Sequence, residues 1–163
     1  MLFLSKSLRL GLGLAAALLV LTAQAQAPSL KVEAAWARAS VPGQMGTGAF
    51  MTLTAAQNLK LVGVSSPVAG VAELHEMKMD GEVMRMRAIE SLDLPAGKPV
   101  EFKPGGYHLM LMELKQVLRK DTQVPLTLSV RNAQGQLSQV QVSVPVALQP
   151  PAGTPAAPPA HKH

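Results

Sequence analysis

Turn-forming residues divide the sequence from residue 30 onward into short runs, and this spacing is the feature that most constrains the fold. The turn signals are Pro42-Gly43, Ser66-Pro67, Asp80-Gly81 and the Gly-containing segments 95–97, 104–106 and 132–135. Short strands separated in this way are typical of an antiparallel sandwich or barrel. We therefore predict a single all-β domain, with strands at 32–39, 47–54, 60–65, 71–79, 82–89, 99–103, 107–114, 126–131 and 137–144. A short helical turn is also expected near residues 114–120.

The two ends of the chain differ in composition from this domain. Residues 1–27 have the pattern of a secretory signal peptide, with Lys6 and Arg9 before an apolar run and an Ala-x-Ala cleavage site at 23–25 or 25–27. The alternative is an uncleaved membrane anchor, but the apolar run is shorter than the roughly 20 residues of a spanning helix. We expect an exported mature chain without stable membrane insertion. The chain has no cysteine, so no lipid-modified N-terminus is expected.

The remaining chain divides into a domain at 28–149 and a Pro/Ala-rich tail at 150–163, which lacks apolar periodicity and is predicted to be disordered. Removing Lys6 and Arg9 lowers the formal net charge from +5 to +3. No run of lysine and arginine exceeds two residues, so a nucleic-acid partner is not expected.

Histidine and methionine gather in the stretch 74–113, around a predicted hairpin. Asp80-Gly81 lies between two alternating runs and predicts a two-residue type I′ loop. That register places Met79 opposite Glu82, Met77 opposite Met84 and His75 opposite Met86, all on one face. The other face would pair Glu76 with Arg85. An imidazole and a thioether on adjacent strands could share a metal ion.

The strand 107–112 repeats this chemistry. His108, Met110 and Met112 fall on one face, and Leu109 and Leu111 on the other. Joining the pair His108 and Met110 to the pair His75 and Met86 gives two imidazoles and two thioethers. This donor set suits Cu(I) and is poor for Ca²⁺, Mg²⁺ or Mn²⁺. Without cysteine the chain cannot form a Cys-containing copper centre, so the predicted site would hold copper rather than cycle it.

The order His75, ten residues, Met86, twenty-one residues, His108, one residue, Met110 resembles the signature of the bacterial periplasmic copper(I) chaperones of the PCu(A)C type. Further matching segments are Ala35-Trp36-Ala37-Arg38, Gly48-Ala49-Phe50-Met51, Leu94-Pro95-Ala96-Gly97 and Gly105-Gly106-Tyr107-His108. The resemblance covers about residues 32–146. It implies a cupredoxin-like Greek-key β-sandwich, a periplasmic location, and transfer of Cu(I) to cytochrome c oxidase, either to its copper-binding subunit or through a thiol-bearing copper-loading protein.

Several residues near the motif have two interpretations. Met77, Met79, Met84 and Met112 are either core filler or satellites of the site, and Met77, Met84 and Met112 are candidate auxiliary ligands. His161 and His163 are either a solvated end of the tail or an auxiliary site, which could take Cu(II). Trp36 is expected to pack against the sandwich.

No sequence motif for catalysis is present, and we expect that the protein is not an enzyme. Three functional classes remain open at this point. They are a copper(I) carrier and donor, an exported copper-buffering or resistance protein with the same ligands, and a metal-free Ig-like interaction module.

Overall fold

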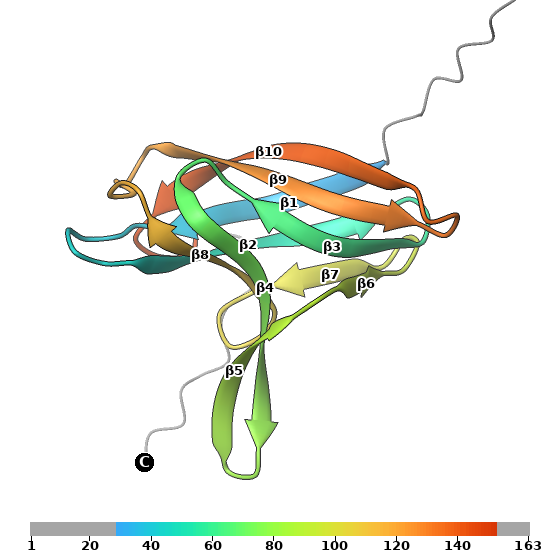
Figure 1. Cartoon of the computed structure of the whole chain (residues 1–163), viewed down its shortest axis with the longest axis horizontal. Helices are drawn as coiled ribbons and strands as arrows, with labels where there is room; N and C mark the ends of the chain where they lie inside the picture. The colour runs from blue at the N-terminus through green and yellow to red at the C-terminus, as the bar shows by residue number, and fades with distance from the viewer. Residues whose placement is uncertain (1–28, 153–163) are drawn as a thin grey trace, which may run out of the picture.

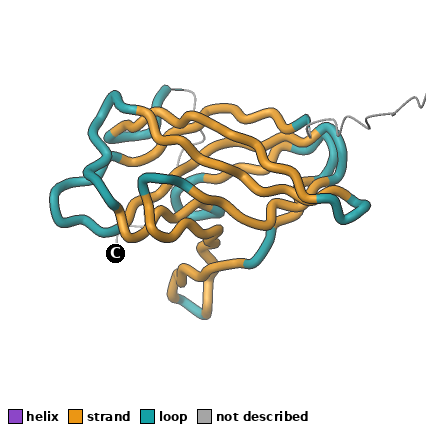
Figure 2. Tube along the Cα trace, turned by 45° about the horizontal axis from the view of Figure 1, so that its top comes forward, coloured by secondary structure: helices purple, strands orange, loops and turns teal. Residues whose placement is uncertain are grey.

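The computed structural model describes residues 29–152, and this part of the chain contains ten strands and no helix (Figures 1 and 2). It therefore has no helix that could cross a membrane. The predicted signal peptide at 1–27 and the tail from residue 153 lie outside the described residues. The strands are β1 (Leu30–Arg38), β2 (Gly46–Ala55), β3 (Leu59–Ser65), β4 (Ala69–Asp80), β5 (Val83–Ile89), β6 (Leu92–Leu94), β7 (Pro99–Phe102), β8 (His108–Leu114), β9 (Gln123–Asn132) and β10 (Leu137–Ala147).

All ten strands belong to one continuous sheet. Its order is β5-β4-β8-β2-β1-β10-β9-β3-β6, and β7 pairs with β2 beside this path. Every pairing is antiparallel except that of β1 with β10, which is parallel. The sheet curves so that β10, β9 and β3 lie over β1 and β2 (Figure 1). The prediction of an all-β fold is confirmed.

The space between the two halves of the sheet holds the apolar core. Alternate residues of β2, β8 and β9 point into it, because side chains of a strand alternate between its faces. Leu53, Leu109, Leu111 and Leu128 are completely buried there. The intervening residues of β8, His108 and Met110, therefore face away from the core, on the outer side of the sheet.

One expectation about local structure is wrong, and one short strand was not predicted. The segment expected to form a helical turn at 114–120 is a loop, because its backbone is tied to Ser40 instead. The Leu118 amide donates to Ser40 Oγ at 2.8 Å, and the Ser40 amide donates to the Leu118 carbonyl at 3.0 Å. Positive φ angles at Glu113 (52°) and Asp121 (66°) flank the loop. The sequence also gave no signal for β6, which is only three residues long.

Candidate metal centre

The hairpin of β4 and β5 projects from the body of the domain (Figures 1 and 2). Its loop is Gly81-Glu82, and Asp80 pairs with Val83 at the ends of the strands. Gly81 has a φ of 64°, whereas Glu82 is not among the residues with positive φ. A glycine at the first loop position is the type II′ pattern, so the predicted type I′ loop at Asp80-Gly81 is wrong. Asp80 instead accepts an ion-pair hydrogen bond from Arg85 Nε at 2.8 Å.

This loop moves every predicted partner in the hairpin by two positions. His75 lies opposite Ala88 rather than Met86, Met77 lies opposite Met86, and Met79 lies opposite Met84. A shift of two residues preserves the face of each side chain. The histidine and the methionines therefore still share one face. On the other face Glu76 pairs with Arg87, not with Arg85 as the earlier register required.

The two histidines meet across β4 and β8. His75 and His108 are directly opposed in the antiparallel ladder, and their ring centroids are 5.7 Å apart. His108 Nδ1 is 3.0 Å from the carbonyl oxygen of Gly106, to which it donates in the neutral ring. Its Nε2 then carries the lone pair, and Nε2 lies 3.1 Å from Met86 Sδ. The structure thus brings His108 and Met86 together although β4 runs between their strands.

His75 is anchored through Nε2, whereas His108 is anchored through Nδ1. Its Nε2 lies 2.9 Å from Glu73 Oε2, so the neutral ring donates to this carboxylate and leaves Nδ1 unprotonated. His75 Nδ1 is buried and has no hydrogen-bond partner. A buried polar atom without a partner costs free energy, whereas a free imidazole lone pair is what a metal ion requires. Each histidine therefore has one anchored nitrogen and one available nitrogen.

Met110 shares the outer face of β8 with His108. It lies opposite Glu73 on β4 and Gly48 on β2. Its terminal methyl is directed toward Gly46, where it would lie 3.7 Å from a Cβ built on that residue. The structure therefore places His75, Met86 and His108 in one cluster. Met110 lies two residues after His108 on the same face of β8.

Burial disfavours the charged form of His108. It lowers the pKa of His108 below the ordinary value of 6.5, and the neighbouring His75 lowers it further, while the hydrogen bond to Gly106 partly opposes both effects. His108 is consequently neutral at pH 7. Among residues 29–152 no group of three or more His, Cys, Asp or Glu side chains could hold a metal ion. The donors of this cluster are imidazole nitrogen and thioether sulfur.

Aromatic side chains form the wall behind His108. Phe50 lies 6.4 Å from the His108 ring, centroid to centroid, and Trp36 stacks on Phe50 at 4.8 Å. Trp36 is buried, as expected. Gly48 makes room for Phe50, because a Cβ on residue 48 would lie only 2.8 Å from Phe50 Cζ. The sequence predicted no role at the site for Phe50 or for Glu73. Glu73 lies two residues before His75 on the same strand, and this spacing was an available signal for its role.

The auxiliary candidates lie in different places. Met77 lies opposite Met86, and Met79 and Met84 continue the hairpin face beyond that pair. Met79 and Met84 are exposed, so the core-filler interpretation is wrong for these two. Met112 follows Met110 on the outer face of β8 and is half-buried. His161 and His163 lie outside the described residues.

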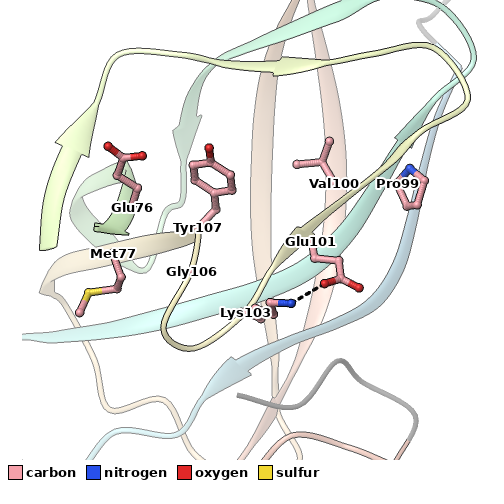
Figure 3. A pocket seen from close by; sticks show the side chains of 8 residues that line it. All are labelled: Glu76, Met77, Pro99, Val100, Glu101, Lys103, Gly106 and Tyr107. Atoms are coloured by element: carbon pink, nitrogen blue, oxygen red, sulfur yellow. Dashed lines mark hydrogen bonds and ion pairs between the residues drawn. The ribbon is translucent and has the colours of Figure 1, made fainter. Parts of the chain in front are cut away.

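A groove of about 570 Å³ adjoins the centre at the base of the hairpin. Glu76, Met77 and Tyr107 lie on one side, and the ion pair between Lys103 and Glu101 lies on the other (Figure 3). The carbonyl of Gly106 links the groove to the site, because it accepts hydrogen bonds from both His108 Nδ1 and the Met77 amide, the latter at 3.2 Å.

Comparison with solved structures assigns this architecture to a class of domains. The apo PCuAC domain from PmoF1 aligns with a TM-score of 0.60 at 21% identity, over 76% of this chain and 97% of that domain. The copper-bound PCuAC domain from PmoF2 aligns with a TM-score of 0.57 at 20% identity, over 74% of this chain and 93% of that one. The solution structure of CuI-DR1885 from Deinococcus radiodurans aligns with a TM-score of 0.58 at 32% identity, over 76% of this chain and 82% of that one. The fold is that of the PCuAC domains, which confirms the resemblance found in the sequence.

The chain belongs to the LpqE-like family. The model of that family, described as "Putative lipoprotein LpqE-like", matches residues 30–146. A relative in Leifsonia xyli subsp. xyli, "Putative lipoprotein Lxx21020", is 32% identical over 116 residues, which cover 71% of this chain and 69% of the relative.

Proposed function

We propose that this protein is a copper(I) chaperone that binds one Cu(I) ion through His75, Met86, His108 and Met110. One observation carries the proposal: two opposed, buried histidines each hold one ring nitrogen in a hydrogen bond and leave the other nitrogen free, one of them beside a thioether sulfur. Two neutral imidazoles with thioethers match the preferences of Cu(I). The copper-bound PCuAC domain from PmoF2 supports copper as the metal, and CuI-DR1885 supports Cu(I) as its form.

An anaerobic Cu(I) titration of the full chain tests the site. X-ray absorption at one equivalent should show both nitrogen and sulfur neighbours. Single substitutions of His75, Met86, His108 and Met110 should each weaken binding, while Met45→Leu, at an exposed methionine outside the cluster, should not. A first equivalent with no sulfur in its coordination shell would rule out this ligand set.

Transfer should run toward a thiolate-bearing acceptor. The proposed ligands are neutral, and a cysteine thiolate is a charged and softer donor for Cu(I). We propose cytochrome c oxidase assembly as the destination, with its copper-binding subunit or a thiol-bearing copper-loading protein as the acceptor, in the periplasm. Met86 is half exposed, so an incoming ligand can replace its sulfur without unfolding the domain.

Mixing Cu(I)-loaded protein with a reduced dithiol acceptor under anaerobic conditions tests this direction. Copper should move to the acceptor faster than the donor unfolds. Copper that remains on the donor at equilibrium would instead favour the copper-buffering alternative, which uses the same ligands. His161 and His163 of the tail are proposed as a separate Cu(II) site, whose removal should leave the first Cu(I) equivalent unchanged.

A further inference from the structure

The outer half of the hairpin carries more methionine than the site described above uses. Met77 pairs with Met86, and Met79 pairs with Met84, so four thioethers form two consecutive cross-strand pairs on one face. The exposed fractions of Met79, Met84 and Met86 are 55%, 46% and 50%. None of the four belongs to the hydrophobic core or packs against it within the described chain. Burial therefore gives no reason for methionine at these positions.

The hairpin geometry brings these sulfur atoms within reach of one another. In a hairpin with a two-residue loop the closing pair, here Asp80 and Val83, is hydrogen-bonded, and the pairs then alternate. Met79 with Met84 and Met77 with Met86 are both non-hydrogen-bonded pairs, in which Cα atoms are about 4.5 Å apart and side chains are closest. The two pairs are about 6.8 Å apart along the strand. Methionine has three rotatable bonds, so thioethers at these positions can converge on one ion.

The charged strand side chains between Glu76 and Arg87 lie on the opposite face of the hairpin, and Glu82 lies in its loop. Glu76 is paired with Arg87, and Asp80 is paired with Arg85. Both carboxylates are therefore engaged by guanidinium groups and point away from the methionines. A cation between the two methionine pairs meets sulfur donors from the strand side chains around it, which disfavours hard ions such as Ca²⁺ and Mg²⁺ and favours a soft monovalent ion.

We propose that Met77, Met79 and Met84 form a second, sulfur-only binding site for a soft monovalent cation, Cu(I) or its chemical analogue Ag(I), next to Met86 on the projecting hairpin. The site lacks imidazole and is exposed, so it fills after the mixed nitrogen and sulfur site and releases its ion more readily. The idea that copper enters or leaves the protein through this second site rests on the proposed function. The existence of the site does not.

The experiment uses the full chain labelled with ¹³C in the methionine methyl groups and titrated with Ag(I), followed by NMR. The first equivalent should shift the methyl resonances of Met86 and Met110. The second should shift those of Met77, Met79 and Met84. The variant Met79→Leu/Met84→Leu, which keeps the volume and apolarity of the side chains, should lose the second response while its first-site affinity stays within about twofold. The matched control is Met45→Leu, because Met45 is 63% exposed and lies at the other end of β8 from the hairpin.

The outcomes separate this proposal from the proposed function. Methyl resonances of Met77, Met79 and Met84 that stay unshifted at millimolar Ag(I), or a second response that persists in the double leucine variant, would overturn the second site and leave the chaperone proposal intact. Resonances of Met77, Met79 and Met84 that respond while those of Met86 and Met110 do not would overturn the first site and support the second. Responses of both sets in order, with only the second lost in the double variant, support both sites. Silver bound by imidazoles elsewhere does not affect the result, because only methionine methyl groups are observed.

Discussion

Glu73 should control copper affinity without touching the ion. Its carboxylate accepts the Nε2 hydrogen of His75 at 2.9 Å and so keeps Nδ1 unprotonated. In Glu73→Gln the acceptor loses its charge, and the amide can instead present its own NH₂ group to Nε2. That arrangement favours the tautomer with hydrogen on Nδ1, in which Nδ1 has no lone pair for a metal ion. Loss of such a partner behind a ligating histidine typically lowers metal affinity 10–100-fold.

The exposure of Glu73 decides where in this range the effect falls. Its side chain is 43% exposed, so solvent screens the bond and water can replace it in part. We expect a loss of about tenfold in Cu(I) affinity, or about 1.4 kcal/mol. The matched control is Glu101→Gln, because that carboxylate is also 43% exposed and bonded, at 2.7 Å to Lys103, but does not contact either histidine.

Two measurements on both variants test this reasoning. Competition with a Cu(I) chelator gives the affinity, and ¹⁵N NMR of the apo protein gives the tautomer of His75. Glu73→Gln should bind more weakly than Glu101→Gln and should show more Nδ1–H tautomer. Equal affinities for the two variants would refute the role of Glu73, whatever the tautomer.

Three further predictions concern His108, Gly48 and Met86. Since burial lowers the pKa of His108 in the folded state, the unfolded state takes up a proton first, so stability should fall as pH drops through about 6.5, by at most about 1.4 kcal/mol per pH unit. Urea titrations at several pH values check this, and His108→Gln should flatten the slope. Gly48→Ala places a Cβ 2.8 Å from Phe50 Cζ and should cost about 1–3 kcal/mol of folding free energy, measured by chemical denaturation. The NMR resonance of His108 should shift as well. An unchanged denaturation midpoint would show that the Phe50 ring moves aside freely. Met86→Leu removes the sulfur from a half-exposed position, so it should change stability by less than about 1.5 kcal/mol while weakening Cu(I) binding in chelator competition; an unchanged affinity would remove Met86 from the ligand set.

Periodicity made the faces of the sheet predictable from the sequence. Alternation along 107–112 correctly placed Leu109 and Leu111 on one face and His108 and Met110 on the other, and the structure shows that the leucine face is the core. The same rule put the hairpin methionines on the face of His75 even though the predicted loop was wrong, because an error of two residues in register does not exchange faces.

Contacts between distant strands were not predictable in the same way. The hairpin register follows local turn chemistry, which allowed both Asp80-Gly81 and Gly81-Glu82 as the loop. The ladder of β4 with β8, which opposes His75 to His108, has no local signal in the sequence. The anchoring roles of Glu73 and Gly106 depend on that ladder and on the turn before β8. The parallel pairing of β1 with β10 joins the two ends of the domain, and no local pattern in the sequence encodes it.

Alternate residues of β8 lie in two different environments. Leu109 and Leu111 are completely buried, whereas His108 and Met110 face outward from the same strand. Under the proposed function, mutations at the outward positions alter metal preference while Leu109 and Leu111 keep their places in the core, so selection for a particular ion and selection for the core act on separate residues. A strand of this kind is a suitable starting point for directed evolution, in which donors at positions 108 and 110 are randomised and variants are sorted for a new metal without rebuilding the core.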